Sequence, residues 1–155
     1  MLDLIIKNGS CYIDKDLKDQ DIAIKDGKII KIGKIDSEAK KTFDAEGLAV
    51  LPGCIDTQTH FREPGSTDTE DLHSGSRAAI VGGITSVFEM PNTNPPTSTK
   101  VEFQKKLDLA KNRMYCNYAF YFGATADNAS ELADLVNLEG CCGIKLFAGS
   151  STGNL

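Results

Sequence analysis

Apolar and polar residues alternate along the first 50 positions of the chain. The alternating runs include Leu2 to Ile6, Ile22 to Ile24 and Ile30 to Ile32, and a period of two residues is typical of half-buried strands. The pair Asp26-Gly27 separates the last two runs, and we expect a hairpin there because glycine takes positive φ at little cost. The pattern in residues 1–50 therefore predicts a partial β-sandwich module. A module of this size buries too little apolar surface to be securely stable alone, so we expect it to need strands from elsewhere.

A different pattern begins at Ala49, where short apolar runs alternate with helix-like stretches. This pattern is typical of βα units with buried parallel strands. The expected strands cover 49–57, 85–90, 114–122 and 143–147, and the expected helices cover 70–81, 99–112 and 128–138. Thr99 (or Ser98 before it) and Asn128 are the expected N-caps of the second and third helices, because Thr99 and Asn128 each lie three residues before a glutamate.

Four parallel strands cannot close a barrel. A closed (β/α)8 barrel takes about 250 residues, and only residues 51–155 remain after the β module, ending in a loop-like tail directly after a strand. The pattern fits either an open four-stranded α/β domain or the first half of a barrel whose remainder is missing from this chain. Both leave an open strand edge beside an incomplete β module, so we expect exposed apolar surface and hence self-association or poor solubility of the chain.

Composition narrows the classes of function. The chain has 17 basic and 22 acidic residues, a formal net charge of −5, and no tryptophan. It carries no dense Lys/Arg run, so the electrostatic footprint of a nucleic-acid-binding protein is missing. No apolar stretch reaches the roughly 18 residues of a membrane span, and the N-terminus lacks a signal-peptide pattern. Five cysteines without CxxC spacing predict reduced thiols and a cytoplasmic location, with Cys141-Cys142 as small core residues.

A dense polar cluster follows the first strand of the βα region. Strand alternation would place four of its side chains on one face, namely Asp56, Gln58, His60 and Arg62. This is the carboxyl end of the strand, where the sites of α/β enzymes form. A histidine, an amide and an arginine together suit a metal and an anion. The alternative is an ordinary loop that carries a lone histidine and a salt-bridged arginine.

Two further segments also end predicted strands. The sequence MPNTNPP at 90–96 is a loop framed by prolines with amide donors, or simply a rigid turn. Lys145 lies inside an apolar strand, where an unpaired ammonium would cost on the order of several kcal/mol. We therefore expect Lys145 to have an ion-pair partner or to be chemically modified.

Taken together, these segments resemble the cyclic amidohydrolases, and most closely the dihydroorotases. The motifs that carry the resemblance are DTQTHFREPG at 56–65, GGIT at 82–85, MPNTNPP at 90–96 and GIKLFAGSSTG at 143–153. The resemblance covers essentially the whole chain, and REPG with MPNT is specific for the dihydroorotase branch. It implies that residues 51–155 are the first half of a TIM-type barrel. The implied activity is zinc-dependent interconversion of N-carbamoyl-L-aspartate and dihydroorotate in pyrimidine biosynthesis.

The resemblance also implies roles for single residues. His60 matches the second histidine of the family's HxH metal motif, and Lys145 matches the lysine whose carboxylated amine bridges two zinc ions. Arg62 and Asn92 match residues that hold the carboxylate of the substrate, a task suited to the planar donor fork of arginine. One or two zinc ions are the implied cofactor, and zinc would lower the pKa of a bound water towards 7.

Two departures from the family pattern have consequences. Gln58 stands where the family has the first histidine of HxH, and a neutral amide oxygen is a poor zinc ligand beside imidazole. One metal position is therefore expected to be weaker or empty. The later histidine ligands and the catalytic aspartate are expected beyond Leu155, so residues 1–155 alone are expected to be inactive. His73 lies in a predicted helix and is not expected to bind metal.

Gln58 also motivates an alternative from a different class. The protein would then be a non-catalytic homologue that keeps the fold as a scaffold for a partner such as aspartate carbamoyltransferase. The enzyme hypothesis is favoured because Arg62, Asn92 and Lys145 are present together, and a scaffold has no evident need of all three. The expected partners are a small-molecule substrate and either a second copy of the protein or aspartate carbamoyltransferase.

Overall fold

The pair Asp26-Gly27 forms the tight turn of a β-hairpin. In the computed structural model both residues take positive φ, 51° for Asp26 and 72° for Gly27. Two central residues at positive φ define a type I′ turn, whose twist matches that of the strands beside it. The turn joins β2 (Asp16–Lys25) to β3 (Lys28–Gly33), which pair antiparallel. The predicted hairpin is confirmed.

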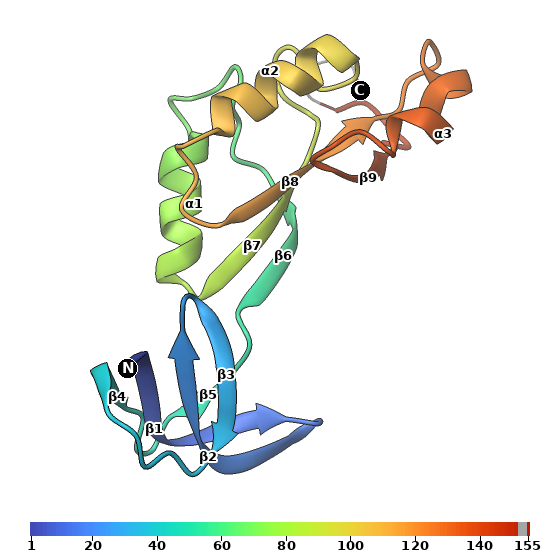
Figure 1. Ribbon diagram of the computed structural model, residues 1–155. Coiled ribbons are helices and arrows are strands. Elements are labelled where there is room, and N and C mark those ends of the chain that lie inside the picture. The colour runs from blue at the N-terminus through green and yellow to red at the C-terminus, as the bar shows by residue number, and fades with distance from the viewer. Residues whose placement is uncertain (152–154) are drawn as a thin grey trace. The chain divides into compact units, whose positions relative to one another are not determined.

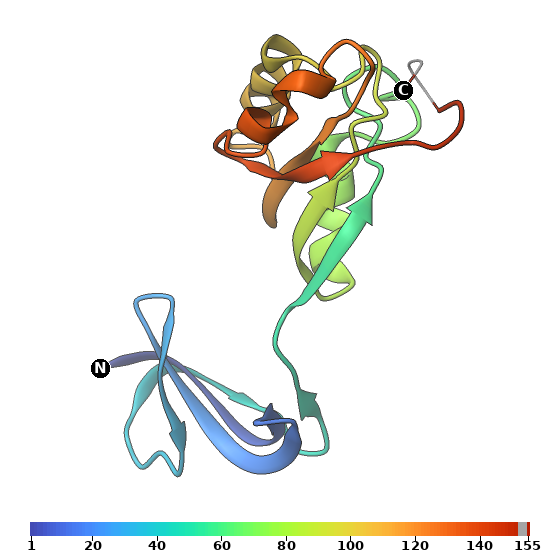
Figure 2. The same cartoon turned by 90° about the vertical axis from the view of Figure 1, so that its right-hand side faces the viewer.

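The chain divides into one unit of strands only and one unit of alternating strands and helices (Figures 1 and 2). The structure describes residues 1–151 and 155. The first unit comprises Met1–Pro52 and the second Gly53–Leu155. Among the described residues, no helix is both long enough and apolar enough to cross a membrane.

The first unit is a five-stranded mixed sheet, sheet A. Its strand order is β3-β2-β1-β4, and β5 pairs with the last residues of β1. The strands not yet introduced are β1 (Leu2–Ile13), β4 (Ala39–Asp44) and β5 (Ala49–Val50). β1 is antiparallel to β2 and parallel to β4 and β5. The unit has a small core of Ile5, Ala23 and Ile35.

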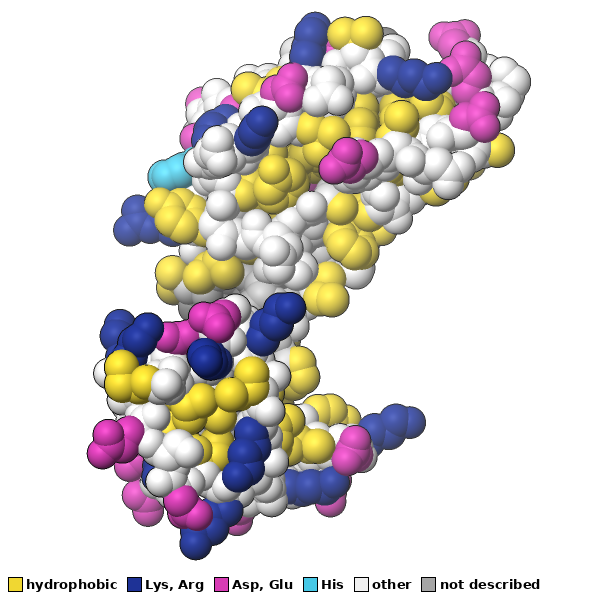
Figure 3. Space-filling view, viewed as in Figure 1, with side chains coloured by type: hydrophobic (Ala, Val, Ile, Leu, Met, Phe, Trp, Pro, Cys, Tyr) yellow, Lys and Arg dark blue, Asp and Glu magenta, His cyan; other side chains and the backbone are white. Residues whose placement is uncertain are grey.

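β3 is an edge strand, and its apolar side chains are exposed. Ile29, Ile30 and Ile32 are 60%, 55% and 45% exposed, and Figure 3 shows apolar side chains on the visible face of this unit. The half-buried interpretation of Ile30 and Ile32 is therefore wrong. Within the unit β3 has β2 as its sheet neighbour on one side alone, and the unit's few core residues cannot cover it.

The second unit contains a four-stranded parallel sheet, sheet B, in the order β6-β7-β8-β9. The strands are β6 (Cys54–Thr59), β7 (Ile84–Glu89), β8 (Asn117–Gly123) and β9 (Cys141–Lys145). The spatial order follows the chain order, so the sheet has no point where the order reverses, as a doubly wound sheet has. This confirms the predicted fold class, α/β with the first part of a barrel, over the open-domain alternative.

Helices occupy each connection between the strands of sheet B. They are α1 (Leu72–Val81), α2 (Lys100–Ala110), the 3-10 turn η1 (Ala129–Glu131) and α3 (Leu132–Leu135). Side chains from these helices pack on apolar side chains of the sheet. The buried core of the unit includes Leu72, Phe103 and Leu135 from helices and Val87, Phe120 and Phe122 from strands.

One predicted strand is in fact two. The expected strand over 49–57 splits into β5, which belongs to sheet A, and β6, which belongs to sheet B. Pro52 and Gly53 lie between them. Pro52 has no backbone N–H for a ladder, and a Cβ on Gly53 would lie 2.2 Å from the side-chain oxygen of Thr85. The chain therefore passes from one sheet to the other at a proline and a glycine that suit these two constraints.

Two of the three expected helices form, and the third does not form as expected. Asp71 caps α1 in a capping box with Ser74, so that helix begins after the predicted Glu70. Thr99 caps α2 by accepting from the Glu102 amide, as predicted. The third prediction is wrong, because a short 3-10 turn and four α-helical residues replace the long helix. The Asn128 side chain makes no cap bond and instead joins loop backbone at Thr125, Gly123 and Ser98.

Candidate active site

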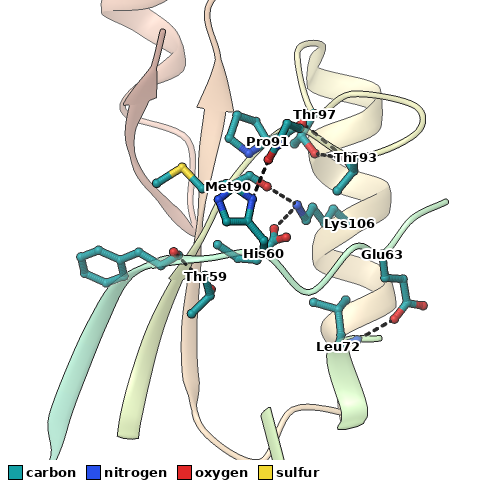
Figure 4. A network of polar contacts seen from close by, with 12 residues as sticks. Thr59, His60, Glu63, Leu72, Met90, Pro91, Thr93, Thr97 and Lys106 are labelled. Carbon is teal, nitrogen blue, oxygen red and sulfur yellow. Dashed lines mark hydrogen bonds and ion pairs between the residues drawn. The ribbon is translucent and has the colours of Figure 1, made fainter. Parts of the chain in front are cut away.

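His60 and Asn92 form a pair where β6 and β7 end. The Met90 amide donates to the Thr59 carbonyl (3.0 Å) and ties the two strand ends together. One residue beyond Thr59, His60 Nδ1 lies 2.9 Å from Asn92 Oδ1, and Figure 4 shows the imidazole beside the Met90–Pro91 backbone. The Asn92 amide nitrogen donates to Ser151 Oγ (3.2 Å). With its oxygen facing the ring, Asn92 assigns the proton to Nδ1 and leaves Nε2 to another partner.

Positive charges surround this imidazole. Burial lowers the pKa of His60 below 6.5, the Asn92 hydrogen bond partly opposes that effect, and the charges of Arg62 and Lys145 lower the pKa further. The imidazole is therefore neutral at pH 7. Lys145 belongs to β9, at the opposite edge of sheet B from β6. The structure thus brings Asn92, Arg62 and Lys145 within electrostatic range of His60.

The predicted alternation does not extend through the whole cluster. β6 ends at Thr59, and Arg62 takes a left-handed φ of 62°, so His60 and Arg62 are not further members of a strand face. Gln58 remains in β6 and is exposed, with its backbone N–H donating to the Asp56 carboxylate (2.9 Å). Among the described residues the Arg62 guanidinium forms no ion pair. The salt-bridged alternative for Arg62 is therefore wrong.

Glu63 holds the segment that carries Arg62, a role that the sequence analysis missed. Its carboxylate receives two hydrogen bonds from the Arg113 guanidinium, 2.8 and 3.1 Å long. It also accepts from the Leu72 amide (2.9 Å) at the start of α1, as Figure 4 shows. Glu63 is 7% exposed. No local pattern marked this role, because Arg113 lies 50 positions from Glu63 along the chain.

The REPG and MPNTNPP segments pack directly on one another. The backbone N–H of Asn94 donates to the Pro64 carbonyl (3.0 Å). Gly65 has a φ of 116°, and a Cβ there would lie 2.8 Å from Asn94 Cβ, so only glycine fits. Thr93 and Thr97 close the second loop with a hydroxyl contact of 3.1 Å. The 90–96 loop is therefore the rigid turn that one interpretation predicted, and it also carries the amide donor that the other interpretation predicted.

A buried ion pair lies beneath the site and was also missed from sequence. Glu89 ends β7, Lys106 lies on α2, and their side chains are 1% and 0% exposed. The Lys106 ammonium also donates to the Met90 carbonyl (3.0 Å) and lies 5.0 Å from the Phe120 ring centroid. Burial raises the pKa of Glu89 to about 7, although Lys106 opposes the shift. No sequence pattern separates Lys106 from Lys105 beside it, whose side chain is exposed.

Lys145 is placed differently from the expectation. It is the last residue of β9, half-buried rather than enclosed, and its ammonium lies 5.0 Å from the Phe147 ring centroid. No ion pair to Lys145 occurs in the part of the chain that the structure describes. The predicted cost of an enclosed, unpaired ammonium is therefore wrong, because solvent and the aromatic ring both stabilise the charge. Carboxylation of Lys145 stays a prediction.

The side chains that the structure describes do not make a zinc site by themselves. Among the described residues, no group of three His, Cys, Asp or Glu side chains is placed to hold a metal ion. His60 presents a suitable nitrogen, whereas Gln58 offers only an amide and Lys145 only an ammonium. His73 lies on α1, as predicted, and its Nε2 is 3.3 Å from the Tyr115 hydroxyl. We therefore assign no catalytic step to a metal here.

The chain belongs to the amidohydrolase family, whose model matches residues 49–141. An allantoinase from Escherichia coli O1:K1 / APEC is 40% identical over 149 residues, which are 96% of this chain and 33% of the allantoinase. A dihydroorotase from Methanosarcina acetivorans is 40% identical over 157 residues, which cover 100% of this chain and 33% of the dihydroorotase. The structure of an L-hydantoinase (dihydropyrimidinase) from Arthrobacter aurescens matches with a TM-score of 0.88 and 33% identity, covering 100% of this chain and 35% of the hydantoinase.

These relatives define a class rather than a single activity. The chain spans about a third of the length of the curated relatives that it matches. All three are enzymes named for cyclic amides, and the allantoinase and the dihydroorotase are equally similar in sequence. The comparisons support the amidohydrolase interpretation and do not separate dihydroorotase from allantoinase.

Proposed function

We propose that the protein containing these residues is a dihydroorotase, a hydrolase of cyclic amides that interconverts N-carbamoyl-L-aspartate and dihydroorotate in pyrimidine biosynthesis. The observation that carries the proposal is the Arg62 guanidinium, which has no ion pair among the described residues and lies close enough to His60 to lower its pKa. Dihydroorotate carries a carboxylate, whereas the rings of allantoin and hydantoin carry none. An arginine fork is suited to bind that carboxylate.

His60 and, once its amine is carboxylated, Lys145 would supply part of a zinc site in this enzyme. The Asn92 oxygen supports this role for His60, because it holds Nδ1 and leaves Nε2 available. The remaining ligands would come from the part of the relatives' length that this chain does not span. Residues 1–155 by themselves are expected to be inactive.

The test is a comparison of substrates on a chain of the relatives' length that contains these residues. We expect it to bind zinc and to cyclise carbamoyl aspartate, with no turnover of allantoin or hydantoin. Replacing Arg62 by Met is expected to raise KM for carbamoyl aspartate at least about 10²-fold, the effect of losing a charged bidentate contact. Arg77→Met on α1 is the matched control. Turnover of allantoin alone would refute the proposal.

The scaffold alternative rests on one observation. Gln58 is exposed on β6 and offers a weak zinc ligand where an imidazole is expected. A metal-free, inert protein that forms a stable complex with aspartate carbamoyltransferase would favour the scaffold. Zinc bound in stoichiometric amount together with cyclisation would exclude it.

A further inference from the structure

The Lys106 side chain reaches the site through a single backbone carbonyl. Its ammonium donates to the Met90 carbonyl (3.0 Å), and the Met90 amide donates to the Thr59 carbonyl (3.0 Å). His60 follows Thr59 directly, and Asn92 lies two residues beyond Met90. Figure 4 shows the Lys106 side chain directed at the Met90 carbonyl from α2. The buried Lys106 ammonium therefore contacts the backbone that positions both His60 and Asn92.

Packing alone does not explain this cation. Glu89 and Lys106 are 1% and 0% exposed, and a buried ion pair can often be replaced by apolar side chains of similar volume with no loss of stability. The surroundings are apolar, because Val87, Phe103 and Phe120 belong to the same core. A leucine and a methionine would fill the space without the cost of desolvating two charges. What they could not supply is a donor to the Met90 carbonyl.

We propose that the Glu89–Lys106 ion pair positions the site, with the Lys106 ammonium fixing the Met90 carbonyl so that Asn92 Oδ1 holds the proton of His60 on Nδ1. Glu89 and Lys106 are positioning residues, since neither would touch the substrate. Glu89 keeps the ammonium charged and oriented in its apolar surroundings. The importance of this arrangement for catalysis rests on the proposed function, but the arrangement itself is tested without any activity.

The chain suits a direct measurement because it has only two histidines. Nitrogen-15 NMR of the imidazole rings above pH 7.5 reports which ring nitrogen carries the proton. His73 is the internal reference, because it lies on α1 beside Tyr115, away from the pair. In the unaltered chain we expect His60 to be the Nδ1–H tautomer. An Nε2–H tautomer would overturn the proposal at once.

The decisive variant is the double replacement Glu89→Leu with Lys106→Met. We expect it to fold, as shown by circular dichroism and an unchanged His73 signal, while the ratio of Nδ1–H to Nε2–H tautomer at His60 falls about fivefold, the ratio that one net hydrogen bond sustains. Lys105→Met is the matched control, since Lys105 is the neighbouring α2 lysine and its ion pair with Glu102 is on the surface. That variant should leave His60 unchanged.

The remaining outcomes also decide the question. An unchanged His60 tautomer in a folded double variant would show that the pair only stabilises the core, and would overturn the proposal. If the double variant fails to fold, Glu89→Gln with Lys106→Met keeps a polar group at position 89 and still removes the donor to Met90. Loss of folding in both variants would likewise assign the pair to stability rather than positioning. If the chain of the relatives' length fails the enzymatic test while the double variant still shifts the His60 tautomer, only the proposed function is refuted, and the positioning role of the ion pair stands.

Discussion

Replacing Gly75 by Ala tests how closely α1 packs against the site. By helix propensity alone, an alanine inside a helix is about 1 kcal/mol more favourable than glycine. A Cβ on Gly75, however, would lie 2.4 Å from Phe61 Cδ1 and 2.7 Å from Cε1. Carbon atoms in contact are about 3.5–4.0 Å apart, so the ring must move by about 1 Å. Phe61 is 6% exposed and belongs to the buried core of the unit.

The two effects have opposite signs, and their sizes decide the outcome. Overpacking of this kind costs about 1–3 kcal/mol, so we expect the free energy of unfolding to fall by up to about 2 kcal/mol after the gain in propensity. The matched control is Gly82→Ala at the end of the same helix. Gly82 has a φ of −82°, and its built Cβ meets nothing closer than 3.5 Å. This variant is expected to be neutral or more stable by up to about 1 kcal/mol.

Urea unfolding of the full chain, followed by circular dichroism at 222 nm, compares the variants. Phe61 lies between His60 and Arg62, so Gly75→Ala should also shift the NMR signals of His60, and Gly82→Ala should not. A Gly75→Ala variant as stable as the parent chain, with an unmoved His60 signal, would refute the reasoning. It would mean that the helix can recede from the ring at no cost.

Three further predictions concern charge and exposure. Glu63→Gln removes the charged partner of a bidentate arginine and should lower stability by about 2–3 kcal/mol in chemical denaturation, against less than about 1 kcal/mol for Glu102→Gln in a surface pair. Because burial raises the pKa of Glu89 from 4.5 to about 7, the folded chain binds this proton more tightly than the unfolded chain does. The contribution of Glu89 to stability is therefore fully present below pH 4.5 and is lost as the pH rises through about 7. Between these pH values the stability of Glu89→Gln relative to the parent chain should rise, and parallel pH profiles of the two melting temperatures would contradict this. Ile29→Lys with Ile32→Lys should reduce self-association of the chain in sedimentation velocity, an expectation that a monodisperse parent chain at high concentration would exclude.

The local pattern of the sequence determined much of the fold. Period-two alternation and the Asp26-Gly27 pair predict the β2–β3 hairpin because both depend on backbone preferences of adjacent residues. The N-cap at Thr99 depends on contacts within one helical turn and is likewise readable from sequence. The expected N-cap bond at Asn128 failed because its side chain found partners at Ser98 and Gly123, and Ser98 is distant in the chain. Tertiary contacts of that kind leave no local pattern.

The candidate site divides in the same way. The sequence by itself indicated His60, Arg62, Asn92 and Lys145, because polar residues at the ends of apolar runs are conspicuous and parallel strands end at one edge of a sheet. Only the tertiary structure revealed that Glu63 is clamped by Arg113, and that Glu89 and Lys106 are buried together beneath the site. Those partners are 50 and 17 positions apart in the printed sequence. Whether a charged side chain faces water or another charge depends on which elements pack together, and that is decided by the fold rather than by neighbours along the chain.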